Sequence, residues 1–190
     1  MMPGRRATTG LISVAMLAGA VSSASAQAGA ETFTATAAVK TAGSAAASAP
    51  VTITVTRKTP QSEVDKLLAA FKAGGAAGLR KALVGVPETG SVQLGAGKPT
   101  PTRMTLERTT DKGRLLTIVS DTPILFLGAG VAGAKPKEGY DFAVIDLEVD
   151  AKGAGSGTLA PAAKVTVKEG AVVVEDYASE LVRLTGVARK

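Results

Sequence analysis

The chain has 190 residues, a formal net charge of +6, and neither cysteine nor histidine. Without cysteine there is no disulfide, no thiolate nucleophile and no cysteine for lipid attachment. Without histidine as well, the common hydrolytic triads and the usual zinc sites are excluded. The basic residues are dispersed and aromatic residues make up only 3% of the chain, so no basic patch with stacking rings predicts nucleic-acid binding.

The first 28 residues have the three parts of a bacterial signal peptide. Arg5 and Arg6 supply positive charge, Leu11–Val21 is an apolar run too short to span a bilayer, and a small-residue cleavage site follows, after Ala26 or Ala28. The residues after the paired arginines lack the hydrophobic residue of a twin-arginine signal, so general secretion is expected. We therefore expect a periplasmic or extracellular protein with no transmembrane segment after signal removal.

Residues 29–190 are expected to form a single β-rich globular domain. This part of the chain holds 20 of the 22 basic residues and all 16 acidic ones, a net charge of +4. Its length, about 160 residues, is enough to bury most of the apolar surface in one core. The mild positive charge allows attraction to an anionic envelope surface, but it is not concentrated in one segment.

The first two predicted strands are rich in threonine. From Glu31 to Val39, and again from Val51 to Arg57, threonines alternate with apolar residues. This period of two is typical of strands with one buried face. The stretch between them, Thr41–Pro50, consists mostly of alanine, serine and glycine and predicts a flexible connection.

A helical hairpin is predicted at about residues 60–84. Thr59 is expected to cap its first helix, with Pro60 at the first helical position. Apolar residues then follow at the spacing of one helix face: Val64, Leu67, Leu68 and Phe71. Gly74-Gly75 is expected to end this helix. Ala76–Val84 is expected to form a shorter second helix, and the two to pack over one end or face of the sheet.

Further strands are predicted in the middle of the chain. Ser91–Leu94 predicts a short strand, and Gly95–Pro101 a loop after it. Alternation on both sides of the turn Asp111–Gly113 predicts a hairpin, with apolar positions at Met104, Leu106, Leu116 and Ile118. Pro123–Leu127 is apolar and expected to be buried, and a loop is expected at Gly128–Lys137.

The clearest strand pattern is Phe142–Asp150, whose second half alternates strictly between apolar and acidic residues. A glycine-rich hairpin loop is expected after it, because glycine takes positive φ without a Cβ clash. The three glycines concerned are Gly153, Gly155 and Gly157.

Two more strands are expected beside it. Alternation resumes at Ala163, and a turn at Lys168–Gly170 leads into the β-branched run Val172–Val174, which predicts three adjacent antiparallel strands. Leu181–Leu184 is expected to be a closing strand. Together the elements predict an α+β fold, mainly antiparallel β: a curved sheet, barrel or sandwich of about 7–9 strands with an inserted helical hairpin.

One motif has the spacing of a dinucleotide-binding fingerprint. Gly128–Gly133 reads GxGxxG, and Glu148 lies 20 residues after Gly128. The mechanism needs a helix that begins at those glycines, but Pro136 interrupts it and Phe142 already begins the next strand. Gly95–Lys98 likewise lacks the upstream glycine and the following hydroxyl residue of a P-loop. We therefore predict no cofactor.

Three acidic residues, Asp146, Glu148 and Asp150, share one face of the predicted strand Phe142–Asp150. A divalent metal site needs oxygens that converge on a point, whereas residues on one strand face stand roughly 6.5–7 Å apart and point in parallel. No metal site is predicted. Asp146, Glu148 and Asp150 are instead expected to form a solvated face paired with Lys164, Lys168 or Arg103.

The remaining catalytic options are carboxylate pairs, a Ser-Lys arrangement or tyrosine. Ser156 and Lys164 do not have a Ser-Lys spacing, so no catalytic residue is predicted. A carboxylate hydrolase would need two acids that converge in a cleft, and the ones to inspect are Glu107, Asp111, Asp141 and Asp146. Tyr177 and the pair Phe126-Leu127 could line a ligand pocket, but packing is their expected role.

Several of these segments recur together in a known pattern. They are the export signal, the threonine-rich first strand, Thr54–Arg57 before the helix, Leu67-Leu68 within it, Phe142, Ile145 and Leu147, the three glycines from Gly153 to Gly157, and Ala163–Val165. In this arrangement the chain resembles a group of exported bacterial proteins of unknown function. The likeness covers nearly all of the mature chain, and it implies a shared arrangement of strands and turns but no catalytic residue.

Three functions remain open at this point. The first is a non-catalytic binding module of the envelope, which holds a small apolar ligand or an envelope protein in the barrel mouth or against the helical hairpin. The second is a structural or interaction protein with no ligand, favoured by a filled interior and an apolar patch outside. The third, ranked last, is a hydrolase that uses carboxylates.

Overall fold

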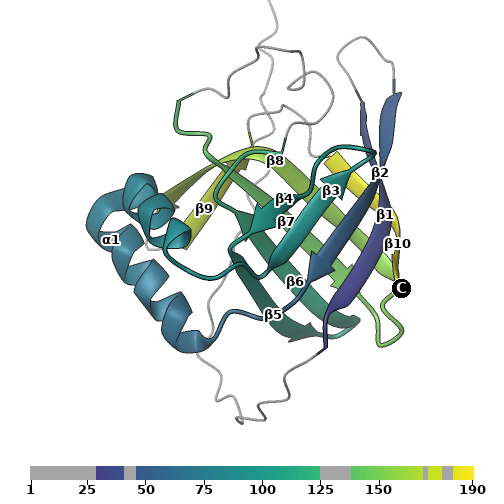
Figure 1. Ribbon diagram of the computed structural model, residues 1–190, viewed down its shortest axis with the longest axis horizontal. Coiled ribbons are helices and arrows are strands. Elements are labelled where there is room, and N and C mark those ends of the chain that lie inside the picture. The colour runs from purple at the N-terminus through teal and green to yellow at the C-terminus, as the bar shows by residue number, and fades with distance from the viewer. Residues whose placement is uncertain (1–28, 41–45, 125–137, 169–170, 177–181) are drawn as a thin grey trace, which may run out of the picture.

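The computed structural model describes residues 29–40, 46–124, 138–168, 171–176 and 182–190 (Figure 1). Within them lie one helix, α1 (Gln61–Val84), and ten strands of a single antiparallel sheet. The strands are β1 (Glu31–Lys40), β2 (Ala46–Val55), β3 (Gly90–Leu94), β4 (Thr100–Thr102), β5 (Met104–Thr110), β6 (Gly113–Ser120), β7 (Phe142–Val149), β8 (Gly155–Lys168), β9 (Ala171–Asp176) and β10 (Val182–Arg189).

The sheet closes almost completely into a barrel. Its order is β4-β3-β2-β1-β10-β8-β7-β6-β5, with β9 paired to β8. The two end strands, β4 and β5, are consecutive in the chain and separated only by Arg103. The predicted α+β fold with a curved, barrel-like antiparallel sheet is therefore confirmed. The described residues contain ten strands rather than about 7–9, partly because Thr100–Thr102, at the end of the predicted loop, pairs with β3 as a short strand.

A bulge beside Arg103 turns the chain from one end of the sheet to the other. Val119 of β6 faces two residues, because it accepts from the N–H of Arg103 at 2.8 Å and pairs with Met104. Thr102 and Thr105 are consequently both buried, although they are three residues apart. A bulge bends and twists its strand, and here the bend allows one segment to serve both ends of the sheet.

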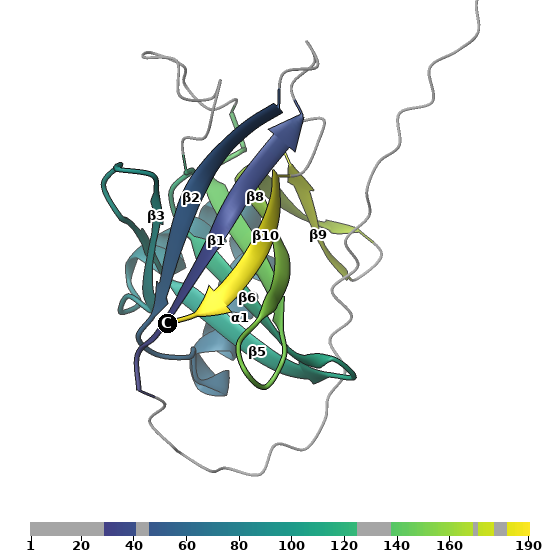
Figure 2. The ribbon, with the colours of Figure 1, turned by 90° about the vertical axis from the view of Figure 1, so that its right-hand side faces the viewer.

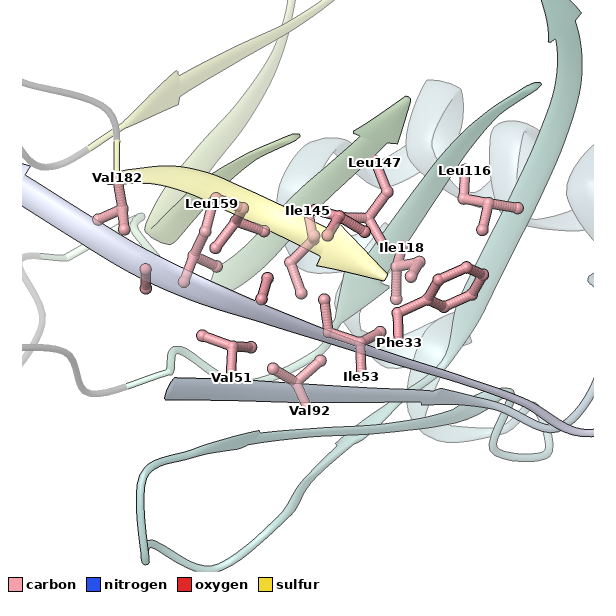
Figure 3. Close-up of a cluster of buried hydrophobic side chains, with 14 of the residues drawn as sticks. Phe33, Val51, Ile53, Val92, Leu116, Ile118, Ile145, Leu147, Leu159 and Val182 are labelled. Atoms are coloured by element: carbon pink, nitrogen blue, oxygen red, sulfur yellow. The ribbon is translucent and has the colours of Figure 1, made fainter. Parts of the chain in front are cut away.

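The interior of the barrel is filled with apolar side chains. They come from alternate positions of the strands, and each is at most 8% exposed. Figure 3 shows side chains of this cluster meeting from different strands. They include Phe33, Val51, Ile53, Val92, Leu116, Ile118, Ile145, Leu147, Leu159 and Val182. A barrel of about eight strands is just wide enough for side chains to fill it.

Helix α1 packs on the outside of the barrel, over β6, β7 and β8 (Figure 1). Its apolar side chains form a second buried cluster with outward residues of these strands, and the largest of those is Phe142, which is fully buried. The helical residues concerned are Leu67, Phe71, Leu79 and Leu83. The helix therefore covers one side of the barrel and leaves the side formed by β1, β2 and β3 uncovered by α1.

The cap of the helix differs from the prediction, whereas its interruption does not. Pro60, not Thr59, is the N-cap residue, and it makes no side-chain cap hydrogen bond. The Thr59 hydroxyl instead accepts from the N–H of Thr105 at 2.9 Å, because Thr59 is buried against β5. As predicted, α1 consists of two helical segments that meet at Gly75, whose φ of 59° and ψ of −150° are not helical. The predicted interruption is therefore present without a separate loop.

Strand β2 begins earlier than its sequence predicts. Residues 46–50, which the sequence assigns to a flexible connection, pair with β1 from Ala46 opposite Lys40 to Pro50 opposite Thr36. Alanine and serine have weak strand propensity, and the neighbouring strand overrides it by supplying a hydrogen-bonding partner. Residues 41–45 lie outside the described residues.

The three predicted adjacent strands are β7, β8 and β9, and both pairings are antiparallel. Of their three glycines only Gly153 has a positive φ, 83°. Gly155 and Gly157 lie at the start of β8, and a Cβ on them would collide with the β7 carbonyl of Glu148 or Asp146. The expectation that all three glycines reverse the chain is therefore wrong, because two of them serve close approach between strands.

The other predicted strands are present in the described residues. Ser91–Leu94 lies in β3, the hairpin around residues 111–113 is β5 and β6, and the predicted closing strand extends to Arg189 as β10. Ile124 is buried, as expected for its apolar segment. The rest of that segment and the predicted loop after it, residues 125–137, lie outside the described residues.

Candidate functional site

The four acids considered for carboxylate catalysis lie on different parts of the fold. Glu107 forms ion pairs at one end of the barrel, Asp141 pairs with helix α1 on the outside, and Asp146 lies on the outward face of β7. Asp111 lies in the turn between β5 and β6. Within the described residues no group of three or more acidic side chains could hold a metal ion. The structure therefore does not bring these acids together in one cleft.

Three acidic residues at the end of β7, which we call the acidic stripe, have other partners than those predicted. They are Asp146, Glu148 and Asp150. Asp146 accepts from the Thr117 hydroxyl at 2.6 Å, and Glu148 lies 3.7 Å from the amine of Lys112. Asp150 leaves the strand and accepts from the backbone N–H of Lys152 and Ala154. The proposed partners were wrong because the register places β6, not the distal part of β8, beside these acids.

The pKa values of two acids in this stripe move in opposite directions. Burial raises the pKa of Asp146, although the hydrogen bond from Thr117 opposes this shift. Backbone hydrogen bonds, that of Ala154 first, lower the pKa of Asp150. A raised carboxylate pKa is typical of some catalytic acids, but within the described residues Asp146 is hydrogen-bonded to Thr117 and influenced by the charge of Arg108, neither of which is an acid.

An ion-pair network, which we call the end cluster, closes one end of the barrel. Arg114 at the start of β6 donates to both carboxylate oxygens of Glu31, at 2.6 and 3.0 Å, and to Glu107 at 2.9 Å. Glu31 also accepts from Arg189 at 3.1 Å, and Glu107 lies 2.7 Å from the amine of Lys58. The members of the end cluster are therefore Glu31, Lys58, Glu107, Arg114 and Arg189.

The end cluster also contacts the apolar core. The guanidinium carbon of Arg114 lies 5.9 Å from the centre of the Phe33 ring, within the range of a cation–π contact. The hydrogen bond from Arg114 holds the pKa of Glu31 below its ordinary value, and the bond to Glu31 raises the pKa of Arg114. Each charge is thus paired, and the cluster is a structural closure rather than a set of free groups.

A second polar group lies beside Arg103, where the chain passes from β4 to β5 and the sheet closes. The Thr105 hydroxyl donates to that of Thr89 at 3.0 Å, and Thr89 also bonds Thr102 at 3.2 Å. Beside them, Nε of Arg103 and Oδ1 of Asp121 lie 3.7 Å apart, and both are buried without a hydrogen bond. The two opposite charges face each other across this distance. They compensate each other electrostatically at the bulge that closes the sheet.

The outer surface of β1, β2 and β3 is the candidate binding site. Its residues, which we call the threonine face, lie at the alternate positions opposite the barrel core: Thr32, Thr34, Thr36, Thr52, Thr54, Ser91 and Gln93. All are half-buried or exposed, and none is charged. Figure 2 looks onto this side of the barrel, where β2, β1 and β10 lie side by side. Helix α1 covers a different side.

The threonine face is an ordered array because of the strand register. Thr32 pairs with Thr54, which pairs with Ser91 on the next strand. In the adjacent row, Thr34 pairs with Thr52, which pairs with Gln93. Hydroxyl and amide groups are therefore repeated along and across three strands.

The sequence contains a signal for this face that is easily taken only as strand periodicity. Thr32, Thr34 and Thr36 alternate in the first strand, and Thr52 and Thr54 do so in the second. Alternation alone indicates which residues share a face, but not that two such strands are neighbours in matching register. The structure adds that information.

Several residues singled out in the sequence lie outside the described residues: Gly128–Gly133, Phe126, Leu127 and Tyr177. Of the Ser-Lys pair, Ser156 lies opposite Glu148 in the β7–β8 ladder, whereas Lys164 lies opposite Glu175 in the β8–β9 ladder. Gly95 and Gly97 belong to the turn between β3 and β4.

No helix in the described part of the chain has the length and apolar character needed to cross a membrane. Comparison with protein-family models, with curated proteins and with solved structures finds no match to this chain. The likeness to exported bacterial proteins of unknown function therefore stays a prediction, and the functional argument depends on the chemistry of the threonine face.

Proposed function

We propose that this protein is an exported, non-catalytic binding module of the cell envelope, which holds a macromolecular partner on the outside of its barrel. The observation that carries this proposal is the uncharged polar face on the outside of the barrel, because the interior is filled. Apolar side chains from the strands of the barrel occupy it, and the end cluster closes one end with paired charges. A ligand of this protein is therefore expected on the outer surface.

The outer surface favours a polar partner over an apolar one. Among the described residues, Val84 is the only large hydrophobic side chain that is clearly exposed, at 60%. A small apolar ligand held against the helix would have to displace Phe71 or Leu83, which are 4% and 0% exposed and packed on the barrel. An uncharged polar face is available instead on β1, β2 and β3.

Export is part of the proposal and is supported by the residue pattern of the first 28 residues. The full chain, expressed in a bacterial host, should be cleaved after Ala26 or Ala28 and recovered in the periplasm or the medium. N-terminal sequencing of the recovered protein measures this. Recovery of the uncleaved chain from the cytoplasm would contradict it.

Native mass spectrometry tests the mode of binding. The mature protein from its native source should have the bare mass of the chain, and cross-linking in the intact envelope should attach it to envelope material. A reproducible small apolar ligand that is lost on denaturation would instead establish a carrier. A bare mass without any cross-linked envelope component would overturn the binding function.

A further inference from the structure

We propose that the threonine face binds an uncharged, hydroxyl-rich polysaccharide chain. This inference rests on the proposed function and names the surface and the class of partner. The face has no charged side chain, although 20% of the chain is charged. Neighbouring outward residues on the same strands, Ala38, Ser48 and Pro50, are uncharged too. Charged residues border the face at both ends: Lys190, whose backbone N–H donates to the Thr32 carbonyl at 2.8 Å, lies at one end, and Lys40 of β1 and Arg183 of β10, which is opposite Ala38, lie at the other.

The absence of charge selects among partners. Nucleic acids and phosphate headgroups need lysine or arginine at their binding surface, and single-stranded nucleic acids also need aromatic side chains for stacking. A face of threonine, serine and glutamine offers neither. It also lacks the large apolar anchors that usually dominate protein interfaces. The partner that matches it is neutral and carries many groups that both donate and accept hydrogen bonds.

The hydroxyls of the face are available for such bonds. Among the described residues, those of Thr32, Thr52 and Thr54 make no hydrogen bond within the protein, and that of Thr34 makes only a long one, 3.5 Å, to the Ala188 carbonyl. A threonine hydroxyl has one donor and two acceptor positions, as a sugar hydroxyl does. Each threonine of the face can therefore both give and take a hydrogen bond from a sugar.

The spacing of the face suits a repeating ligand. Neighbouring strands lie about 4.8 Å apart, and same-face residues along a strand roughly 6.5–7 Å apart. Threonine is β-branched and stiff, so its side chain loses little freedom on binding. The long axis of the face follows β1 and β2, each of 10 residues, which favours an extended chain over a single sugar. A class of small, partly open barrels binds oligosaccharides on one strand face and the loops beside it.

Binding of mature protein, residues 29–190, to neutral polysaccharides tests the proposal. The probes are insoluble amorphous cellulose and chitin in sedimentation, and soluble dextran and starch in affinity electrophoresis. Retention should occur on at least one of them, and should increase with chain length because single hydroxyl contacts are weak and add along a polymer. Dextran sulfate serves as a charged comparison. Absence of retention on all four neutral probes would overturn the inference.

Substitutions locate the surface. The double variant Thr34→Val and Thr52→Val removes two hydroxyls but keeps side-chain shape, and should weaken binding about tenfold. Thr52→Lys introduces a charge at the centre of the array and should weaken binding at least as much. Thr109→Val, at an exposed position of β5 outside the face, is the matched control and should bind as the unchanged chain does. Equal binding by all variants would overturn the assignment to this face. Thermal unfolding confirms that each variant is folded.

The outcomes separate this inference from the proposed function. If the protein cross-links to the envelope but Thr52→Lys does so equally well and no polysaccharide is retained, the binding function stands and the threonine face is not its site. If the unchanged protein is retained on polysaccharide and Thr52→Lys is not, both the binding function and the assignment of its site to the threonine face are supported. Capture by growing ice instead of by polysaccharide would show that the array orders water, and would overturn the glycan assignment.

Discussion

The two outer sides of the barrel have opposite surfaces on strands of the same kind. Under α1, strands β6 and β7 direct Val119, Phe142 and Val144 outward, where the helix buries them. On the open side, which Figure 2 faces, the residues of β1, β2 and β3 at the alternate positions opposite the core form the threonine face. The inward residues are apolar on both sides. The outward residues alone therefore distinguish the covered side from the open one.

Strand β7 shows this difference within eight residues. Its first half is apolar on both faces, because Phe142 and Val144 lie under the helix. Its second half alternates, because Asp146 and Glu148 lie beyond the helix and are only partly buried. Strict alternation thus marks the part of a strand that meets solvent, and continuous apolar sequence marks the part that is covered on both faces.

The largest expected effect is the loss of packing under the helix. Phe142→Ala removes a fully buried ring between β7 and α1 and should lower the free energy of unfolding by about 3–5 kcal/mol. Thr34→Ala, on the open side, should change it by less than about 0.5 kcal/mol. Urea denaturation followed by circular dichroism measures both. Similar losses in the two variants would contradict the distinction between the sides.

The second effect concerns the salt bridge that ties the two sides together at the end cluster. Glu31 belongs to β1 on the open side and Arg114 to β6 on the covered side. Glu31→Gln should lower the free energy of unfolding at neutral pH by about 1.5–3 kcal/mol, the range for hydrogen bonds to charged groups. Asp141→Asn breaks the more exposed pair with Arg80 and should cost less than about 1 kcal/mol.

The contribution of Glu31 should depend on pH with a defined sign. Its pKa is lower in the folded protein than the value of about 4.3 in an unfolded chain. The folded state is therefore stabilised above the unfolded pKa, and this stabilisation is lost as the pH falls through the folded pKa. The difference between the unchanged chain and Glu31→Gln should shrink in acid. A difference that stays constant with pH would rule out the ionised carboxylate as its cause.

The third effect tests the break that shapes the covering helix. Gly74→Ala and Gly75→Ala place the same methyl group at adjacent positions, and neither meets another atom within 4 Å. Only Gly75 has a positive φ, so Gly75→Ala should cost about 1–3 kcal/mol through backbone strain. Gly74→Ala should instead stabilise by about 0.5–1 kcal/mol. Thermal unfolding of the two variants measures this difference. Equal unfolding midpoints would show that the positive φ at Gly75 does not require glycine.

The smallest effect lies at the border of the covered side, at Asp146. Because burial raises the pKa of Asp146, its ionised form destabilises the folded state at neutral pH. Asp146→Asn still accepts the hydrogen bond from Thr117 and should slightly stabilise the protein. The gain should shrink as the pH falls below the folded pKa and vanish below the lower unfolded pKa, because the Asp146 carboxyl is then protonated in both states. Urea midpoints at neutral and acidic pH measure it, and a loss at neutral pH would contradict this reading.

Much of the fold could be predicted because strand periodicity is a local property. The alternation around Ile53, Ile118 and Ile145 predicts strands whose inward residues do fill the barrel. The helix and its break at Gly75 follow from spacing and from the glycine pair. Strand β4, which has three residues with a proline in the middle, and the first residues of β2, which are mostly alanine and serine, could not be predicted because neighbouring strands determine their pairing.

The polar groups were harder to predict because their partners are distant in the chain. Glu31 and Arg114 are 83 residues apart, and Glu31 and Arg189 are 158 apart. Glu107 was considered only as a possible catalytic acid, whereas the structure makes it part of the end cluster. Charges pair according to register and barrel closure, which no local pattern reports.

By itself, the sequence determined which residues face inward along most strands, where the helix bends and which chemistries are excluded by the absence of cysteine and histidine. These are properties of single residues and of short-range periodicity. The tertiary structure decided that the sheet closes at Arg103, that α1 covers one side, and that the threonines of β1 and β2 form one array. Each of these depends on the register between strands, a property that arises only when distant segments pair.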